Sequence, residues 1–224
     1  MACDFSVASD LARFGQAGPR HGSAPDGGST DFLHLYVGLG NAIESCTICE
    51  PWSAYKALRL GLVNRVVPVL VQDGSFFPNP LVITNRWVDD EGGIAYGESV
   101  PATAAGAAKA VIASATIDFA RLDGAVGELS AKLLHTMPDC LVKTLESLRK
   151  KKLEHWQQNC ETNRSWLALN MMTEAKAGFR AFNQGAAGHR EVDFAELRRR
   201  LARGDAWNDE LCDAIQPSAG VGVR

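Results

Sequence analysis

Residues 13–32 read RFGQAGPRHGSAPDGGSTDF, and the rest of the fold can be worked out from this stretch. Its glycines and prolines are typical of turns, while Ser29 or Thr30 can cap a following helix and Asp31 suits the first turn of that helix. From Phe32 onward, apolar residues recur at i, i+3, i+4 and i+7. The stretch therefore predicts a glycine-rich loop that leads into a helix with one buried face.

The segments on either side alternate between strand and helix. Upstream, residues 2–8 form an apolar, strand-like run with no leader or cap, from which we expect the chain to be a fragment of a longer protein. Downstream, helices are predicted over residues 41–49 and 52–60, the second with Pro51 near its start. Residues 62–68 predict a short strand. This alternation indicates an α/β fold.

Composition divides the remainder of the chain into three parts. Residues 73–100 hold Asp-Gly, Pro-Asn-Pro and Glu-Gly-Gly turns around a short apolar run, which predicts an inserted surface excursion with a strand or hairpin. Residues 101–215 are helical in pattern, with a new helix starting at Pro138, and residues 216–224 are expected to form a flexible tail. Residues 1–72 are then the core of the α/β part.

Composition also excludes several classes of function. The 224 residues are 46% hydrophobic and carry a formal net charge of −3, so one domain can form a core and no overall basic field is available for nucleic acid. No apolar run approaches the roughly 20 residues of a membrane span, and no secretory signal is visible, so we predict a cytoplasmic protein. Cys46 and Cys49 form a lone C-x-x-C, which we interpret as two buried thiols rather than as a zinc site.

The order of several short motifs resembles that of the crotonase superfamily, the enoyl-CoA hydratases and isomerases. The motifs are ACD at residues 2–4, FGQ at 14–16, GPR at 18–20, YKAL at 55–58 and GLVNRVVP at 61–68. Their order and spacing together are more specific than any one of them. The resemblance implies that the chain is the C-terminal part of a crotonase-like β/α spiral, followed by a mostly helical C-terminal region.

A narrower resemblance points to a ring-opening hydrolase branch of the superfamily. It includes residues 14–23, the CEP motif at 49–51, the excursion after Pro68, WLALNMM at 166–172 and GFRAFN at 178–183. In the superfamily, two backbone N–H groups form an oxyanion hole for the thioester oxygen. The resemblance places both donors upstream of the segment that matches this chain.

Three residues are candidate catalytic groups. Asp26 matches an acidic catalytic residue of the superfamily and could relay protons, and the alternative is an ordinary Asp-Gly turn. His21 could orient or deprotonate water, or it could be a structural histidine bonded to a backbone carbonyl. Glu50 could face the acyl pocket, or it could cap the helix that follows Pro51.

Three further residues are assigned to substrate binding: Gly18, Ser23 and Arg190. Gly18 stands where hydratases of the superfamily carry a catalytic glutamate, and its absence disfavours hydration by two glutamates. The glycine could serve only a tight turn before Pro19, and its missing side chain could also leave space for a bulky ring. Arg190 falls where relatives place basic residues near the CoA phosphates. The basic run at residues 149–152 is interpreted as a solvated helix face rather than a second phosphate site.

The resemblance implies hydrolysis of a cyclic β-oxo acyl-CoA with cleavage of a ring carbon–carbon bond, as in anaerobic aromatic degradation. The alternatives are an enoyl-CoA hydratase or isomerase of the same superfamily and a non-catalytic, truncated assembly piece. The expected partner is the acyl-CoA substrate, and neither nucleic acid nor a membrane is expected. No metal or redox cofactor is expected either, because the CoA thioester itself activates the substrate. A homo-oligomer, trimer or hexamer, is also implied. We interpret one apolar stripe as core or subunit interface: Trp166, Leu169, Met172, Phe179 and Phe182.

Overall fold

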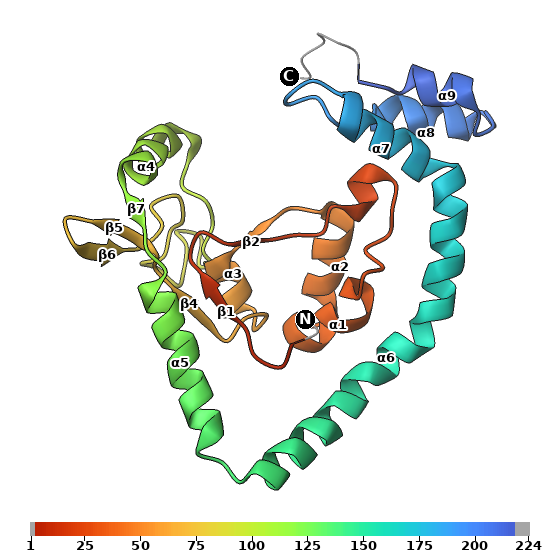
Figure 1. The fold of residues 1–224 in the computed structure, drawn as a ribbon. Coiled ribbons are helices and arrows are strands. Elements are labelled where there is room, and N and C mark those ends of the chain that lie inside the picture. Colours follow the sequence, from red (N-terminus) through yellow and green to blue (C-terminus); the bar gives the residue numbers. More distant parts are fainter. Residues whose placement is uncertain (1–2, 218–224) are drawn as a thin grey trace.

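A computed structural model describes residues 3–217 of the chain (Figure 1). Ala2 of the first motif and residues 218–224 of the expected tail lie outside the described residues. The first hundred residues form short strands and helices at the centre of the view, and two long helices enclose them on two sides. The observed elements agree with an α/β fold followed by a mostly helical C-terminal region.

Two pairs of short strands bring distant parts of the central region together. Strand β1 (Val7–Ser9) pairs in parallel with β4 (Arg65–Val67), the strand predicted over residues 62–68. Strand β2 (Arg13–Phe14) pairs in antiparallel fashion with β3 (Trp52–Ser53). The parallel pair needs a long crossover connection, which the loop and helices between the strands supply.

The predicted loop and helices lie between these strands. They are the 3-10 helix η1 (Gly18–His21), α1 (Ser29–Val37), α2 (Leu39–Ile48) and α3 (Ala54–Arg59). The expected cap of α1 is wrong, because Gly28 is the N-cap residue and no side chain caps this helix. The hydroxyl of Ser29 instead donates to Gln16 Oε1 at 2.8 Å, which ties the helix start to the strand side of the loop.

Apolar side chains from these helices fill a small core. One buried cluster joins α1 and α2 to β3 through Leu33, Val37, Ala42 and Trp52. A second joins β1 to α3 and the segment before β4 through Ala8, Ala57 and Val63. Helix α1 does bury one face, but the predicted spacing selected partly the wrong residues: Phe32, Leu33 and Val37 are buried, whereas Leu35 and Leu39 are 43% and 65% exposed.

The excursion begins with a hairpin that lies partly before residue 73. Strands β5 (Leu70–Gln72) and β6 (Ser75–Phe77) pair around Asp73 and Gly74, which both have positive φ, 51° and 73°. This turn suits Asp-Gly because a left-handed backbone favours these residue types. Strand β5 also pairs with β7 (Thr116–Ile117), so the hairpin is attached to the helical region. The division of the chain into segments stays a prediction.

Polar contacts attach the excursion to the central region. Asp10 is 1% exposed, and its carboxylate accepts hydrogen bonds from the backbone N–H of Val69 at 3.2 Å and of Asn79 at 2.7 Å. The guanidinium of Arg59 donates to the carbonyl of Thr84 at 3.2 Å and stacks 4.0 Å from the ring centre of Trp87. These bonds hold the irregular part of the excursion, which follows the β5–β6 hairpin, against the central region.

Helices dominate after residue 100. They are α4 (Ala102–Ser114), α5 (Ala120–Leu134), α6 (Pro138–Met172), α7 (Glu174–Gln184), α8 (Phe194–Ala202) and α9 (Asp209–Ala214). The predicted helix start at Pro138 is confirmed, since proline is well suited to the first helical turn. Helices α7 to α9 cluster at the far end of α6 (Figure 1). Within the described residues 3–217, no helix is both long and apolar enough to cross a membrane.

Helix α6 crosses the molecule while burying very little of itself. Of its 35 residues, only Asn170 is buried. The apolar stripe at its end does not form a core within this chain, because Trp166, Leu169 and Met172 are 51%, 60% and 76% exposed. Part of the basic run turns toward the central region, where Arg149 pairs with Asp4 and Lys152 Nζ lies 3.1 Å from the carbonyl of Cys3.

Candidate active site

The glycine-rich loop packs too closely for side chains at two of its glycines. A Cβ on Gly18 would lie 2.5 Å from the carbonyl oxygen of Ser23, so the space beside Gly18 is filled by the loop backbone. Gly22 ends η1 with a φ of 77°, and a Cβ there would lie 2.1 Å from the carbonyl oxygen of Glu174. The tight-turn interpretation of Gly18 therefore describes this structure, and a glutamate at this position would require the loop to move.

The junction between α6 and α7 holds the other side of the loop. Gly178 of α7 faces the backbone of His21, whose carbonyl oxygen would lie 2.3 Å from a Cβ on Gly178. At the end of α6, Asn170 Nδ2 donates to the carbonyl oxygen of Gly22 at 3.2 Å and to Glu174 Oε2 at 3.3 Å. The C-terminal helices thus hold the loop by close backbone packing and by one side-chain amide.

The structure brings two predicted residues, His21 and Arg190, against one aromatic ring. The imidazole of His21 meets Phe182 edge-on with 4.8 Å between ring centres, and its Nδ1 is buried with no hydrogen-bond partner in the described residues. The guanidinium of Arg190 lies 5.7 Å from the centre of the same ring. The backbone carbonyl partner that one interpretation gave His21 is therefore absent at Nδ1 within the described residues, and the ring contact with Phe182 is what the structure shows for this imidazole.

Asp26, Ser23 and Glu50 are not joined to this group by any hydrogen bond or ion pair in the described part of the chain. The backbone N–H of Asp26 donates to the carbonyl of Ala24 at 2.8 Å, and its half-buried carboxylate makes no such bond within residues 3–217. The hydroxyl of Ser23 donates to the same carbonyl at 3.1 Å. Glu50 is exposed, and Ser53 caps the following helix by accepting from Lys56 N–H at 3.0 Å. Their assigned roles stay predictions.

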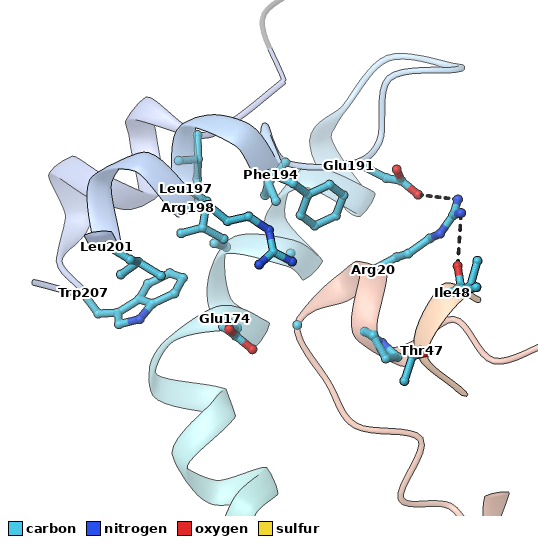
Figure 2. A pocket seen from close by; sticks show the side chains of 16 residues that line it. Arg20, Thr47, Ile48, Glu174, Glu191, Phe194, Leu197, Arg198, Leu201 and Trp207 are labelled. Carbon is cyan, nitrogen blue, oxygen red and sulfur yellow. Dashed lines mark hydrogen bonds and ion pairs between the residues drawn. The ribbon is translucent and has the colours of Figure 1, made fainter. Parts of the chain in front are cut away.

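A cavity of about 510 Å³ opens beside this loop, between η1, the end of α2, helices α7 and α8, and the residues that flank α9 (Figure 2). Apolar side chains form one wall, notably Leu197, Leu201 and Trp207. Charged groups face the other side: Arg20 pairs with Glu191 at 3.3 Å and donates to the carbonyl of Ile48 at 3.3 Å. An apolar wall with a few polar groups is typical of ligand pockets.

None of the six predicted site residues lines this cavity, although neighbours of four of them do. Pro19, Arg20 and Gly22 flank Gly18, His21 and Ser23, and Glu191 follows Arg190. Arg198 and Glu174 were missed because they lie on helices whose pattern indicated only a charged surface or a core. Asn170 could have been found, since a polar side chain inside an apolar helical stripe is a signal of a specific polar contact.

Several buried groups have displaced pKa values, and one of them, Cys49, lies near Arg20 of the loop. Burial raises the pKa of the Asp10 carboxyl, against the hydrogen bonds from Asn79 and Val69, and burial also raises the pKa of Tyr55 to about 12. Burial raises the pKa of the Cys46 and Cys49 thiols as well. Cys49 is buried but Cys46 is partly exposed, so the expectation of two buried thiols holds for Cys49 alone. Among residues 3–217, no group of three histidines, cysteines or carboxylates is arranged to hold a metal ion.

Known proteins resemble the chain over nearly its whole length. Residues 1–73 match the family model described as Enoyl-CoA hydratase/isomerase. A curated protein from Thauera aromatica, named 6-oxocyclohex-1-ene-1-carbonyl-CoA hydrolase, is 51% identical over 220 residues, which cover 98% of this chain and 58% of that protein. A protein of the same name from Geobacter metallireducens has the same identity and coverage. The chain thus spans less than two thirds of these relatives.

A solved structure shows the fold independently. An enoyl-CoA hydratase from Mycobacterium avium subsp. paratuberculosis superimposes with a TM-score of 0.54 at 21% sequence identity, covering 82% of this chain and 55% of that chain. The predicted fold class, a part of the crotonase spiral with a helical C-terminal region, is confirmed by this likeness and by the observed elements.

Proposed function

Because residues 1–73 carry the enoyl-CoA hydratase/isomerase pattern, we propose that this chain is part of a crotonase-superfamily hydrolase that opens the ring of 6-oxocyclohex-1-ene-1-carbonyl-CoA. The observation that carries the proposal is the 51% identity over 220 residues to proteins named for that reaction. An acyl-CoA is therefore the proposed partner, and a cytoplasmic location belongs to the same proposal.

The proposed chemistry uses two molecules of water. The first adds across the ring alkene conjugated to the thioester. The second attacks the ring ketone, and the bond between the ketone carbon and the carbon next to the thioester breaks, which leaves a carboxylate and a thioester enolate. Protonation of the enolate completes a linear mono-thioester. An oxyanion hole stabilises the enolate, and no metal or redox cofactor is needed because the thioester accepts the charge.

The loop supports this chemistry better than simple hydration. A catalytic glutamate is absent at Gly18, and the Ser23 carbonyl occupies the place where its Cβ would begin. Asp26 and His21 then remain as proton carriers in the same loop, and Asp26 has no competing ion pair within residues 3–217. Arg190 is exposed beside Phe182, where its charge is free to meet a CoA phosphate. Glu50 and Ser23 are proposed as lesser contacts.

Exposed apolar surface favours an oligomer. Helices α5 and α6 present a long row of such side chains, including Val126, Leu134, Val142, Leu148 and Leu153. Surfaces of this kind normally mark protein interfaces. We therefore keep the homo-oligomer, a trimer or hexamer, as part of the proposal, and a non-catalytic assembly piece as its rival.

Product analysis tests the reaction. The chain is incubated with 6-oxocyclohex-1-ene-1-carbonyl-CoA, alone and after co-expression with the portion of the Thauera aromatica relative that it does not span; we call the second preparation the reconstituted enzyme. Mass spectrometry of a ring-opened product shows the gain of two waters, whereas a hydratase product shows the gain of one and keeps the ring. Two waters support the proposal. A product that has gained one water and keeps its ring would show that the chain is part of a hydratase. If neither preparation forms a product, the result supports the rival, a non-catalytic assembly piece.

A further inference from the structure

Asn170 reverses the expected burial pattern at the end of α6. It is 4% exposed, while the apolar residues around it, Leu169, Met171 and Met172, face outward. A side-chain amide that is buried in preference to its apolar neighbours must be held by its polar contacts, because burial alone would favour the neighbours.

The contacts of Asn170 converge on the loop that carries His21. Its Nδ2 donates to the carbonyl oxygen of Gly22 at 3.2 Å and to Glu174 Oε2 at 3.3 Å. Gly22 directly follows His21 in the chain, and it lies against the backbone of Glu174. One amide therefore connects the end of α6, the start of α7 and the loop, at the point where the chain leaves His21.

The Oδ1 atom of Asn170 shows that the residue is not optimised for stability alone. This acceptor is buried and has no partner among the described residues. Leaving a buried acceptor unpaired weakens the folded state. An apolar side chain of similar size would avoid that loss, so the useful part of Asn170 is the donor that reaches Gly22.

We propose that Asn170 is a positioning residue, which fixes His21 by holding the Gly22 carbonyl. The inference rests on the proposed function, because His21 is a candidate proton carrier only within it. Gly178 and Phe182 restrain His21 from α7, and Asn170 supplies a side-chain hydrogen bond to the Gly22 carbonyl. Without that bond, the peptide between Gly22 and Ser23 keeps only the hydrogen bond from the Ser23 N–H to the Gly18 carbonyl oxygen at 2.9 Å among the described residues. The loop next to His21 can then shift, and the imidazole loses its fixed place against Phe182. Proton transfer is sensitive to such displacements of the reacting groups.

The test uses two matched amides of α6. Asn170→Leu removes the bond to the loop at nearly constant volume. Asn159→Leu is the control, because Asn159 Nδ2 also bonds the central region from α6, to Asp31 Oδ1 at 2.9 Å, away from His21. The first readout is the imidazole signal of His21 in nuclear magnetic resonance spectra of the full chain, assigned with His21→Gln. Phe182→Leu provides the spectrum of a displaced imidazole.

Asn170→Leu is expected to move the His21 signals toward those of Phe182→Leu, and Asn159→Leu to leave them in place. In the reconstituted enzyme, Asn170→Leu should lower kcat by about 10²-fold with KM changed by less than about twofold. Unmoved His21 signals, or equal movement in both variants, would overturn the proposal even if turnover falls. If Asn170→Leu does not fold, Asn170→Ser decides by the same spectra. An inactive wild-type enzyme counts against the proposed function alone, because the spectra need no turnover.

Discussion

The first hundred residues and the two long helices α5 and α6 differ in how many of their side chains are buried. The central region buries Leu33, Trp52 and Leu70 together with two carboxylates, Asp10 and Asp31. Helices α5 and α6 contain 15 and 35 residues, and only Ala125 and Asn170 of these are buried. The central region is therefore organised by contacts within the chain, while the long helices offer their apolar side chains outward.

The difference in burial indicates that the central region determines the stability of the chain and that the long helices determine its association. Burial of apolar side chains and the hydrogen bonds of Asp10 stabilise the central region, whereas Asp31 Oδ2 is buried with no partner in the described residues. The long helices touch it through a few contacts, such as Phe32 stacked on Trp156 at 5.9 Å between ring centres and the ion pair of Asp4 with Arg149. We expect substitutions in the central region to change the free energy of unfolding, and substitutions on the exposed helix face to change association.

A matched pair of leucines gives the largest expected contrast. Leu33 is 1% exposed and Leu148 is 66% exposed. Leu33→Ala should lower the free energy of unfolding by about 3 kcal/mol, through lost burial and a cavity. Leu148→Ala should change it by less than about 0.5 kcal/mol. Urea unfolding followed by circular dichroism measures both, and equal losses would show that α6 is packed in solution as tightly as the core.

A matched pair of carboxylates sharpens the comparison at a smaller scale. In Asp10→Asn, the new amide N–H₂ group faces the N–H of either Val69 or Asn79, so one buried donor loses its acceptor. The expected loss is about 2 kcal/mol in the free energy of unfolding. Asp90→Asn is the control, since Asp90 is an exposed partner of Arg86 and its loss should cost less than about 0.5 kcal/mol. A stable Asp10→Asn protein would remove Asp10 as the anchor of the excursion.

The pH dependence of stability is expected to have opposite signs inside the central region, at Asp10, and at its contact with α6, where Asp4 meets Arg149. Burial raises the pKa of Asp10 above 3.8, so its contribution to stability is fully present below that pH and is lost as pH rises through the raised value. The hydrogen bond from Arg149 lowers the pKa of Asp4, so its contribution is present above pH 3.8 and is lost as pH falls through the lowered value. When the pH is raised from about 4, the wild-type protein should therefore lose stability relative to Asp10→Asn. When the pH is lowered below about 4, the wild-type protein should lose stability relative to Asp4→Asn. Urea unfolding across this range measures both differences, and curves of the same slope would contradict the assignment.

Local patterns predicted much of this fold and little of the candidate site. Proline at residue 138, the apolar spacing from Phe32 and the GLVNRVVP strand each act over a few residues, so helix α6, helix α1 and strand β4 could be located. Helix α9 lies inside the region predicted to be helical, but its six residues are too few for periodicity to set its bounds, although Asn208 caps it. The contact of His21 with Phe182 joins segments far apart in the chain, and only the fold reveals it.

The central claim is that the loop of the central region carries the proton chemistry, and Asp26 is its most direct test. Asp26→Asn nearly preserves shape, and the carboxylate makes no ion pair within residues 3–217, so folding should be unchanged by circular dichroism. Steady-state turnover of 6-oxocyclohex-1-ene-1-carbonyl-CoA by the reconstituted enzyme should fall by about 10²–10⁴-fold, with little change in substrate affinity. A well-folded Asp26→Asn enzyme whose turnover stays within about threefold of wild type, well below the general acid/base range, would contradict the account and leave His21 as the remaining candidate.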